Sequence, residues 1–334
     1  MSKSVFLNDM PAEVARVYSQ QVVETLCKEA DLDSAVYSRE FVISNPEKFA
    51  DTEYVFSTWG MPVFSEKEVQ CIFPSLKAVF YAAGTVQSFA HPFLKCGVKI
   101  FSAWAANAVP VAEYTVAQIL LANKAFYRSS IIHNQSSYYE QRNTFLQYRG
   151  NYGAKVGIIG AGMIGKLIIE MLKPYRLEVL VFDPFLPDEK AAELGVEKCS
   201  LQRIFSECDV VSNHLANNQQ TQGMLNGELF RRMPENATFL NTGRGAQVVE
   251  QDLIDVLTSR PDITAVLDVT EPEPPVEGSP LYTLENCALT PHIAGSSGEE
   301  VHRMAEYMLG EYKKHTNGEP TQYEVTLKML ETMA

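Results

Sequence analysis

The chain has 334 residues, 46% of them hydrophobic and 21% charged, with a formal net charge of −13. This length favours two domains with an ordinary globular composition. The acidic balance argues against nucleic acid or an anionic membrane surface as a partner, because both require a basic face. The first residues lack the apolar core of a signal peptide, and no apolar run reaches the roughly 20 residues of a membrane span. We therefore expect a cytoplasmic protein.

The six cysteines show no metal-binding pattern. None lies in a CxxC pair, and none stands near a histidine at metal-ligand spacing. We expect no metal site, and we expect the cysteines to be small buried hydrophobic residues in a reducing compartment. They are Cys27, Cys71, Cys96, Cys199, Cys208 and Cys287.

In chain order, the first third alternates short apolar runs with amphipathic ones. Strands are predicted at 4–8, 54–58, 77–82 and 98–101, and a helix at 11–28 carries its apolar residues on one face. This alternation is typical of an α/β domain with a parallel sheet. A longer apolar-faced helix at 110–126 links this part to the next.

A second strand–helix series begins near residue 154. Its apolar runs are "AKVGIIG", "LEVLVFD", "DVVSNH", "ATFLNT", "TAVLDV" and "CALTPH". A Pro-rich loop lies at 271–280, and a helical stretch at 297–316 returns the chain to the first part. The sequence therefore predicts two α/β units.

The strongest motif is the glycine pattern G-x-G-x-x-G formed by Gly160, Gly162 and Gly165. A strand pattern precedes it and a helix pattern follows, as a dinucleotide-binding turn requires. We expect Gly160 to permit the tight turn, Gly162 to let the backbone approach a pyrophosphate, and Gly165 to let helix and strand pack closely. The alternative is a glycine-rich packing turn with no ligand.

Residues around this turn indicate which dinucleotide binds. The backbone amides of Met163 and Ile164 would face the phosphates, where the helix dipole favours negative charge. Asp183 ends the next strand and would accept hydrogen bonds from the adenosine ribose. Its carboxylate would repel a 2′-phosphate, which favours NAD over NADP.

Four polar residues follow later strands, and they carry the candidate chemistry. Arg244 follows strand 237–241, Asp268 ends the next strand with Glu273 after it, and His292 follows the last strand. Taken alone, each could be a purely structural residue in a loop or at a cap. Together they supply an arginine for a substrate carboxylate, a titrating imidazole and a carboxylate to orient it. Such a set suits hydride transfer to a 2-oxo acid.

The segments "GIIGAGMIG", "LNTGRG", "LDVTEPEP" and "LTPHIAGS" resemble motifs of the D-isomer-specific 2-hydroxyacid dehydrogenase family, and the likeness extends from about residue 50 to 320. The resemblance implies that Arg244 binds substrate, that His292 is the acid/base, and that Glu273 pairs with it. It also implies that Asp268 contacts the nicotinamide carboxamide. Further cofactor contacts implied in this way are Thr242, Gly243, Ala294, Gly295, His214 and Thr221.

The family also implies the fold and the assembly. We expect a Rossmann NAD-binding domain at 107–299, inserted in a smaller flavodoxin-like α/β substrate domain formed by 1–106 and 300–334. Most members of the family are homodimers, so a homodimer is expected here.

The substrate loop departs from the family pattern. Ala83-Gly84-Thr85 stands where the family usually has G-V/A-G, so Gly84 and Thr85 are expected to bind substrate with altered geometry. Trp59 could cover the substrate or belong to the core. Glyoxylate, hydroxypyruvate and longer oxo acids remain open as substrates. The alternative function is a non-enzymatic, NADH-sensing corepressor-like binding protein.

Overall fold

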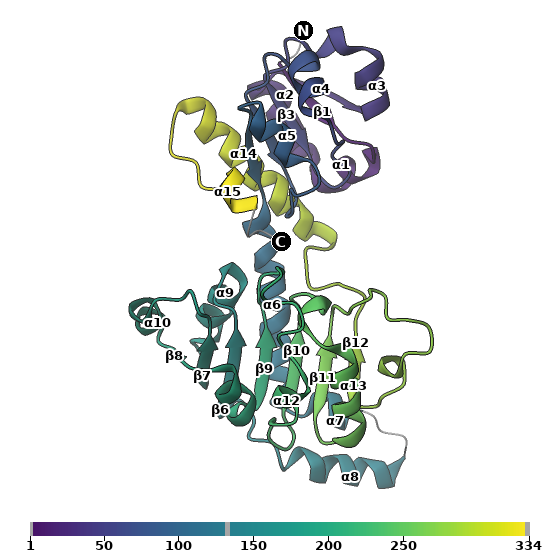
Figure 1. Ribbon diagram of the computed structural model, residues 1–334, viewed down its shortest axis with the longest axis vertical. Coiled ribbons are helices and arrows are strands. Elements are labelled where there is room, and N and C mark those ends of the chain that lie inside the picture. The colour runs from purple at the N-terminus through teal and green to yellow at the C-terminus, as the bar shows by residue number, and fades with distance from the viewer. Residues whose placement is uncertain (1–2, 131–133, 331–334) are drawn as a thin grey trace. The chain divides into compact units, whose positions relative to one another are not determined.

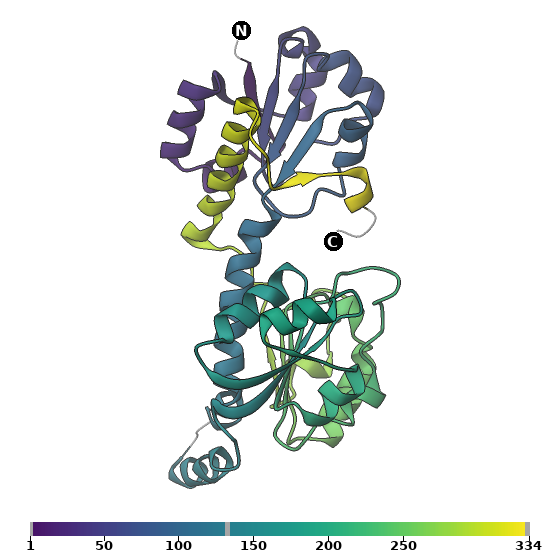
Figure 2. The same cartoon turned by 90° about the vertical axis from the view of Figure 1, so that its left-hand side faces the viewer.

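The computed structural model describes residues 3–130 and 134–330. The chain divides into two compact units, unit 1 formed by residues 1–107 and 296–334 and unit 2 by residues 108–295. Each unit has a central sheet with helices on both faces (Figures 1 and 2). The division places residues 107 and 296–299 in unit 1, whereas we expected them in the cofactor domain.

The sheet of unit 1 has the strand order β13-β5-β4-β3-β1-β2. All its neighbours pair in parallel except β13, which is antiparallel to β5. The order 2-1-3-4-5 within it is the flavodoxin-like doubly wound arrangement. The strands are β1 (Ser4–Leu7), β2 (Leu32–Tyr37), β3 (Tyr54–Ser57), β4 (Ala78–Tyr81), β5 (Lys99–Ser102) and β13 (Glu324–Val325).

Two apolar cores cover the two faces of this sheet. Alternate residues of one strand enter different cores, since Val5 and Leu7 pack in one and Phe6 in the other. The Phe6 core is covered by α1 (Pro11–Val17), α2 (Gln20–Glu29), α14 (His302–Asn317) and the first turn of α6 (Trp104–Ala122). The opposite core is covered by α3 (Arg39–Ser44), α4 (Glu66–Ile72) and α5 (Ala90–Lys95), with the short α15 (Leu327–Leu330) against it.

The sheet of unit 2 is parallel throughout, in the order β12-β11-β10-β9-β6-β7-β8. Read from β6 as the first strand, this is the Rossmann order 3-2-1-4-5-6 with one further strand. The strands are β6 (Tyr152–Ile159), β7 (Arg176–Phe182), β8 (Glu197–Lys198), β9 (Val210–Asn213), β10 (Thr238–Asn241), β11 (Thr264–Leu267) and β12 (Cys287–Leu289).

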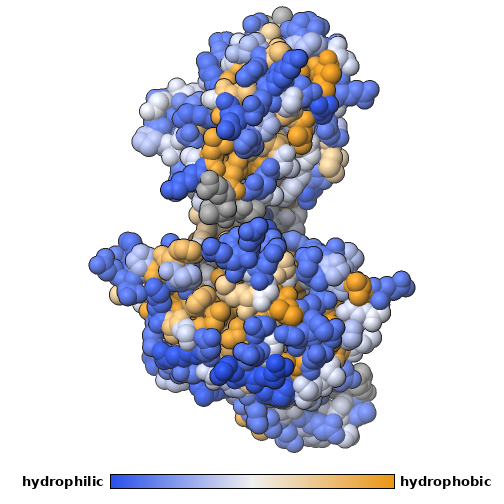
Figure 3. Space-filling view, viewed as in Figure 1, coloured by the Kyte–Doolittle hydropathy of each residue, from blue (hydrophilic) through white to orange (hydrophobic). Residues whose placement is uncertain are grey.

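The helices of unit 2 also lie on both faces of its sheet. One face is covered by α6, α9 (Met163–Leu172) and α10 (Asp188–Leu194), and the other by α11 (Leu201–Glu207), α12 (Gly227–Phe230) and α13 (Glu250–Ser259). The short helix α7 (Phe126–Ser129) and α8 (Gln135–Phe145) stand between α6 and β6 in the chain. Hydrophobic and hydrophilic residues are mixed over the visible face of this unit (Figure 3).

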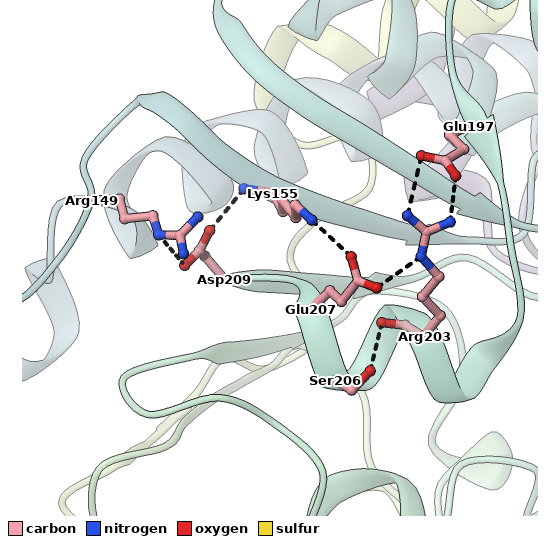
Figure 4. A network of polar contacts seen from close by, with 7 residues as sticks. All are labelled: Arg149, Lys155, Glu197, Arg203, Ser206, Glu207 and Asp209. Atoms are coloured by element: carbon pink, nitrogen blue, oxygen red, sulfur yellow. Dashed lines mark hydrogen bonds and ion pairs between the residues drawn. The ribbon is translucent and has the colours of Figure 1, made fainter.

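A chain of charged side chains ties α11 to two strands of unit 2, β6 and β8 (Figure 4). Glu207 accepts from Lys155 Nζ on β6 at 2.7 Å and from Arg203 Nε at 2.9 Å. Arg203 also pairs with Glu197 on β8. Asp209, just before β9, accepts from the Lys155 backbone at 2.8 Å. The two hydrogen bonds to Glu207 lower its pKa to about 2.

The predicted α/β architecture with an inserted Rossmann domain is confirmed, but several elements differ in detail. The helix expected at 11–28 is two helices, because Ser19 caps α2 through a hydrogen bond from Val22 N, while Tyr18 points inward and donates to Ser57 O. The linking helix runs from 104 to 122 rather than from 110 to 126. The strands β2, β8 and β13 and the helix α8 were not predicted.

The cysteine prediction was wrong in part. All six are unpaired, but Cys27 and Cys71 are exposed and only Cys208 is fully buried. Both exposed cysteines lie on the outer sides of helices that bury other residues, Val22 and Leu26 on α2 and Val69 and Ile72 on α4. Among residues 3–130 and 134–330, no helix has both the length and the hydropathy of a transmembrane span.

Candidate active site

The candidate residues of unit 2 gather at the carboxyl ends of its strands. Gly160 follows β6, Asp183 follows β7, His214 follows β9, Thr242 follows β10, and the segments beginning at Asp268 and Thr290 follow β11 and β12. In an open parallel sheet all these ends lie on one edge, and β6 is the strand at which the order reverses. Ligands of doubly wound folds bind in this position.

The three glycines of the fingerprint have three different surroundings. Gly160 has φ +93°, and a Cβ there would lie 2.6 Å from the carbonyl oxygen of His214. A Cβ at Gly165, on α9, would lie 2.1 Å from the carbonyl oxygen of Gly160. A Cβ at Gly162 would meet nothing within 4 Å, so open space lies above the start of α9. The turn is therefore closed against protein at Gly160 and Gly165 and open at Gly162, which fits a pyrophosphate.

Asp183 joins the glycine turn to the end of β7. Its Oδ2 accepts from Ala161 N and its Oδ1 from Phe185 N, each at 2.8 Å. The carboxylate is thereby held beside the glycine turn, where the ribose of a dinucleotide lies in this fold. Met163 and Ile164 open α9, and the side chain of Met163 is exposed.

His292 and Glu273 form the closest acid–base pair of the site. The imidazole Nδ1 lies 2.7 Å from Glu273 Oε1, and each side chain is nearly half exposed. His292 has φ +55°, and its backbone N–H donates to the carbonyl oxygens of Asp268 and Thr290. This turn is left-handed at a non-glycine residue, a conformation that persists only where neighbouring contacts hold it.

A cavity of about 380 Å³ opens beside this pair. It is lined by Asp268, Thr270, Glu273, Pro274, Pro275, Tyr282, Leu289, Thr290, Pro291 and His292. Its lining is mostly apolar with a few convergent polar groups, as is usual for small-molecule sites.

Asp268 holds the turn that carries His292. This carboxylate is only 2% exposed. Its Oδ1 accepts from Thr290 Oγ1 at 2.6 Å and from Ile293 N at 2.8 Å, and its Oδ2 accepts from Ala294 N at 3.0 Å. The capping role that the sequence left open for Asp268 is present here, whereas its contact with the nicotinamide carboxamide stays a prediction.

Arg244 stands on a loop packed against the segment that leads to Glu273. A Cβ at Gly245 would lie 2.0 Å from the carbonyl carbon of Thr270, so the two loops touch at their backbones. Arg244 is half-buried, and its Nη1 donates to Gly243 O at 2.7 Å. The guanidinium can offer its remaining N–H groups to a carboxylate.

The other predicted cofactor residues of unit 2 line the same edge. His214 Nε2 lies 2.8 Å from Ser212 Oγ, and Nδ1 lies 3.5 Å from Thr242 Oγ1. Burial lowers the pKa of His214 to about 3, so its ring is neutral at physiological pH. The Thr221 hydroxyl donates to Ala216 O at 2.7 Å, within its own loop. Ala294 is buried and Gly295 partly so.

In unit 1, the predicted substrate residues follow β3 and β4. Ser102 Oγ donates to the carbonyl oxygens of Ala83 and Gly84, and a Cβ at Gly84 would meet nothing within 4 Å. Thr85 is exposed. Trp59 packs at the margin of both cores of unit 1, and the guanidinium of Arg16 lies 4.9 Å above its ring. Trp59 therefore packs against the cores of unit 1 and is also partly exposed.

Together, the fold and the glycine turn define unit 2 as a dinucleotide-binding domain. The family model described as "D-isomer specific 2-hydroxyacid dehydrogenase, NAD binding domain" matches residues 116–294. The chain belongs to the D-isomer specific 2-hydroxyacid dehydrogenase family, and unit 2 carries its NAD-binding domain.

Individual relatives agree with this assignment. The chain is 37% identical over 155 residues to a glyoxylate reductase of Korarchaeum cryptofilum, covering 46% of this chain and 47% of that protein. It is 34% identical over 173 residues to the human glyoxylate reductase/hydroxypyruvate reductase, covering 52% and 53%. The matched regions span from 38% to 66% of the length of the curated relatives.

Solved structures share the fold across nearly the whole chain. The apo form of Rhodotorula graminis D-mandelate dehydrogenase has a TM-score of 0.81 at 19% identity, covering 97% of this chain and 98% of that one. An NAD-complexed D-isomer specific 2-hydroxyacid dehydrogenase of Lactobacillus delbrueckii has a TM-score of 0.75 at 19% identity, covering 97% and 100%.

Proposed function

We propose that the protein is an NAD-dependent 2-oxoacid reductase that interconverts a 2-oxo acid and a D-2-hydroxy acid. The observation that carries this proposal is the 2.7 Å contact of His292 Nδ1 with Glu273 Oε1 beside the cavity. Because Glu273 holds Nδ1, Nε2 is the nitrogen that exchanges a proton with the substrate oxygen.

Each residue has a distinct task. Arg244 binds the substrate carboxylate through its guanidinium, which orients the ketone toward His292. His292 donates a proton to the ketone oxygen, and Glu273 stabilises the imidazolium before the proton leaves. NADH, when bound, supplies the hydride that reaches the ketone carbon. Asp268 keeps the His292 turn in place through its three hydrogen bonds.

The residues present fit the cofactor. The space above Gly162 admits a pyrophosphate, and Asp183 lies where it can accept from the ribose hydroxyls. A 2′-phosphate at this position would face the Asp183 carboxylate, which supports NAD rather than NADP. Gly84, Thr85 and Trp59 of unit 1 are proposed to select the substrate side chain.

The test measures NADH consumption against a panel of 2-oxo acids that includes glyoxylate and hydroxypyruvate, with NADPH in parallel. We expect turnover with NADH and a much weaker rate with NADPH. His292→Asn should lower kcat by about 10² or more, the usual loss for a general acid. The same substitution should leave the affinity for NADH almost unchanged, because His292 lies outside the glycine turn.

Two outcomes contradict this proposal. Full activity in the His292→Asn variant would remove His292 from the chemistry. Tight NADH binding without turnover on any 2-oxo acid would instead favour the alternative function, a non-enzymatic NADH-sensing protein whose partner binding depends on the cofactor.

A further inference from the structure

Three buried side-chain amides lie beneath the loop of Arg244. Asn213 ends β9, Asn241 ends β10 in register with it, and Gln247 closes the 3-10 helix Gly245–Gln247. Their exposed fractions are 0%, 1% and 0%. We call these three residues the amide triad.

The triad is connected by direct hydrogen bonds. Asn213 Nδ2 donates to Asn241 Oδ1 at 3.0 Å and to Gln247 Oε1 at 2.6 Å. Gln247 Nε2 donates to Leu215 O at 2.7 Å. Among the buried polar atoms of the described residues that lack a partner, none belongs to the triad. A buried polar network that is fully satisfied in this way fixes its members in one arrangement.

The same amides hold the backbone on both sides of Arg244. Asn241 Oδ1 accepts from Gly243 N at 3.1 Å, and Gln247 Oε1 accepts from Arg244 N at 3.3 Å. Asn241 Nδ2 donates to Arg244 O at 3.2 Å. The triad therefore binds the backbone N–H groups of Gly243 and Arg244 and the backbone carbonyl of Arg244.

Gly243 shows how closely the loop is seated. A Cβ at this position would lie 3.0 Å from Asn213 Nδ2, 3.0 Å from Gln247 Oε1 and 3.2 Å from Asn213 O. The backbone of the loop thus rests directly on the triad, and any shift of the amides is transmitted to Arg244.

We propose that Asn213 and Gln247 are positioning residues for Arg244. Both are buried and distant in sequence, and neither lines the cavity beside His292. Each acts by fixing the loop from which the guanidinium binds the substrate carboxylate. The inference rests on the proposed function, since it gives Arg244 a substrate to hold. An amide is required because each position uses a donor and an acceptor at once.

The test replaces Gln247 by methionine, which keeps the side-chain length and removes both amide functions. Gln247→Met leaves the Arg244 N–H without its acceptor. We expect kcat/KM for the 2-oxo acid to fall about 10- to 100-fold, the scale of small misplacements in an active site. NADH affinity should change much less, because the glycine turn belongs to β6 and α9. Should Gln247→Met not fold, Gln247→Asn retracts the amide while keeping its chemistry, and the same fall is expected.

Asn286 offers a matched control in the same unit. It is 7% exposed, and its Nδ2 donates to the carbonyl oxygens of Leu257, Arg260 and Ile263. Ile263 directly precedes β11, so this amide lies at the opposite end of the strands from Arg244. Asn286→Leu should lose comparable stability and keep the kinetic constants of the unmodified protein. An equal fall in kcat/KM in both variants would reduce Gln247 to a merely structural residue.

A double-mutant cycle tests whether Gln247 acts through Arg244. In an Arg244→Lys background, Gln247→Met should lower kcat/KM little further, because the guanidinium that the triad positions is already absent. Additive losses would overturn the proposal.

Hydrogen exchange separates this inference from the proposed function. Exchange of the backbone amides of 241–248 should accelerate in Gln247→Met and stay unchanged in Asn286→Leu, whether or not any 2-oxo acid is reduced. If the unmodified protein turns over no 2-oxo acid, the proposed function fails. The exchange rates of residues 241–248 would still show whether the triad holds the loop of Arg244. Unchanged exchange at 243 and 244 would show that the triad does not hold Arg244.

Discussion

His214 illustrates how burial fixes the protonation of a single side chain. Its ring lies between Ser212 and Thr242, and burial lowers its pKa from 6.5 to about 3. The unfolded chain takes up a proton below about pH 6.5, whereas the folded chain does so only near pH 3. The contribution of this histidine to stability is therefore complete above pH 6.5 and decreases as the pH falls toward 3.

This linkage predicts how a substitution changes acid sensitivity. When the pH falls from 7.5 to 4.5, keeping this ring neutral should lower the free energy of unfolding by about 3 kcal/mol, since pH 4.5 lies two units below the pKa of the unfolded chain. His214→Gln should lower Tm at pH 7.5 through lost packing, yet lose less further stability on acidification than the unmodified protein. Thermal melts across this range give the comparison. His91→Asn, at an exposed position, is the control and should keep the acid sensitivity of the unmodified chain.

At the residue scale, the sequence reveals backbone requirements better than it reveals side-chain networks. The fingerprint predicts a tight turn at Gly160 and close packing at Gly165, and the structure has φ +93° and a 2.1 Å approach there. Asn213 and Gln247 carry no such signal. Their contact joins residues 34 positions apart, and an asparagine after a strand is also common in ordinary turns.

At the element scale, hydrophobic periodicity identifies buried strands and misses exposed ones. The strands β4, β9, β10 and β11 are buried along their whole length, and each was predicted. The unpredicted strands β2, β8 and β13 form three of the four sheet edges, and both residues of β8 are exposed. An edge strand needs few apolar residues, so its pairing follows from its neighbours rather than from its own sequence.

The charged cluster of Figure 4 joins one such edge strand to the centre of the sheet. Arg203 binds Glu197 on β8 and Glu207 on α11, and Glu207 binds Lys155 on β6. Because these bonds lower the pKa of Glu207 to about 2, its stabilising effect is present above its unfolded pKa of 4.5 and is lost as the pH falls toward 2.

Glu207→Gln should therefore lower Tm by a small amount at pH 7 and low ionic strength. The difference from the unmodified protein should shrink in 1 M salt, where exposed charges are screened, and should vanish near pH 2. Glu285→Gln, in the turn before β12, removes an exposed carboxylate elsewhere in the unit and should have no such effect. A difference that persists in high salt would assign the loss to packing rather than to charge.

At the scale of the whole molecule, the order of elements along the chain predicts the architecture. Two strand–helix series separated by a long helix, with a last helix that returns to the first series, indicate two α/β units, and the resemblance to the family adds that one is inserted in the other. The structure has this arrangement, since residues 296–334 add α14 and β13 to the unit that the first 107 residues begin. The loops after β3 and β4, which we propose to select the substrate, are not predictable in the same way, because they take their shape from contacts such as Ser102 with Ala83.

Because each unit has its own pair of cores, the two units are expected to unfold as separate cooperative transitions. The glycine turn and Asp183 belong to unit 2, so NADH should stabilise that unit alone. At a free NADH concentration one hundred times Kd, mass action contributes about 2.7 kcal/mol to the liganded unit. Calorimetry should then show one transition moving to higher temperature and the other staying in place.

Two comparisons make this result interpretable. NADPH at the same concentration should move neither transition appreciably, since its 2′-phosphate would face the carboxylate of Asp183. Asp183→Ser should narrow the difference between the two cofactors by removing that repulsion. A single transition that shifts as a whole with NADH would show instead that the cofactor couples the two units, and that binding draws on residues of unit 1 as well as on the turn at Gly160.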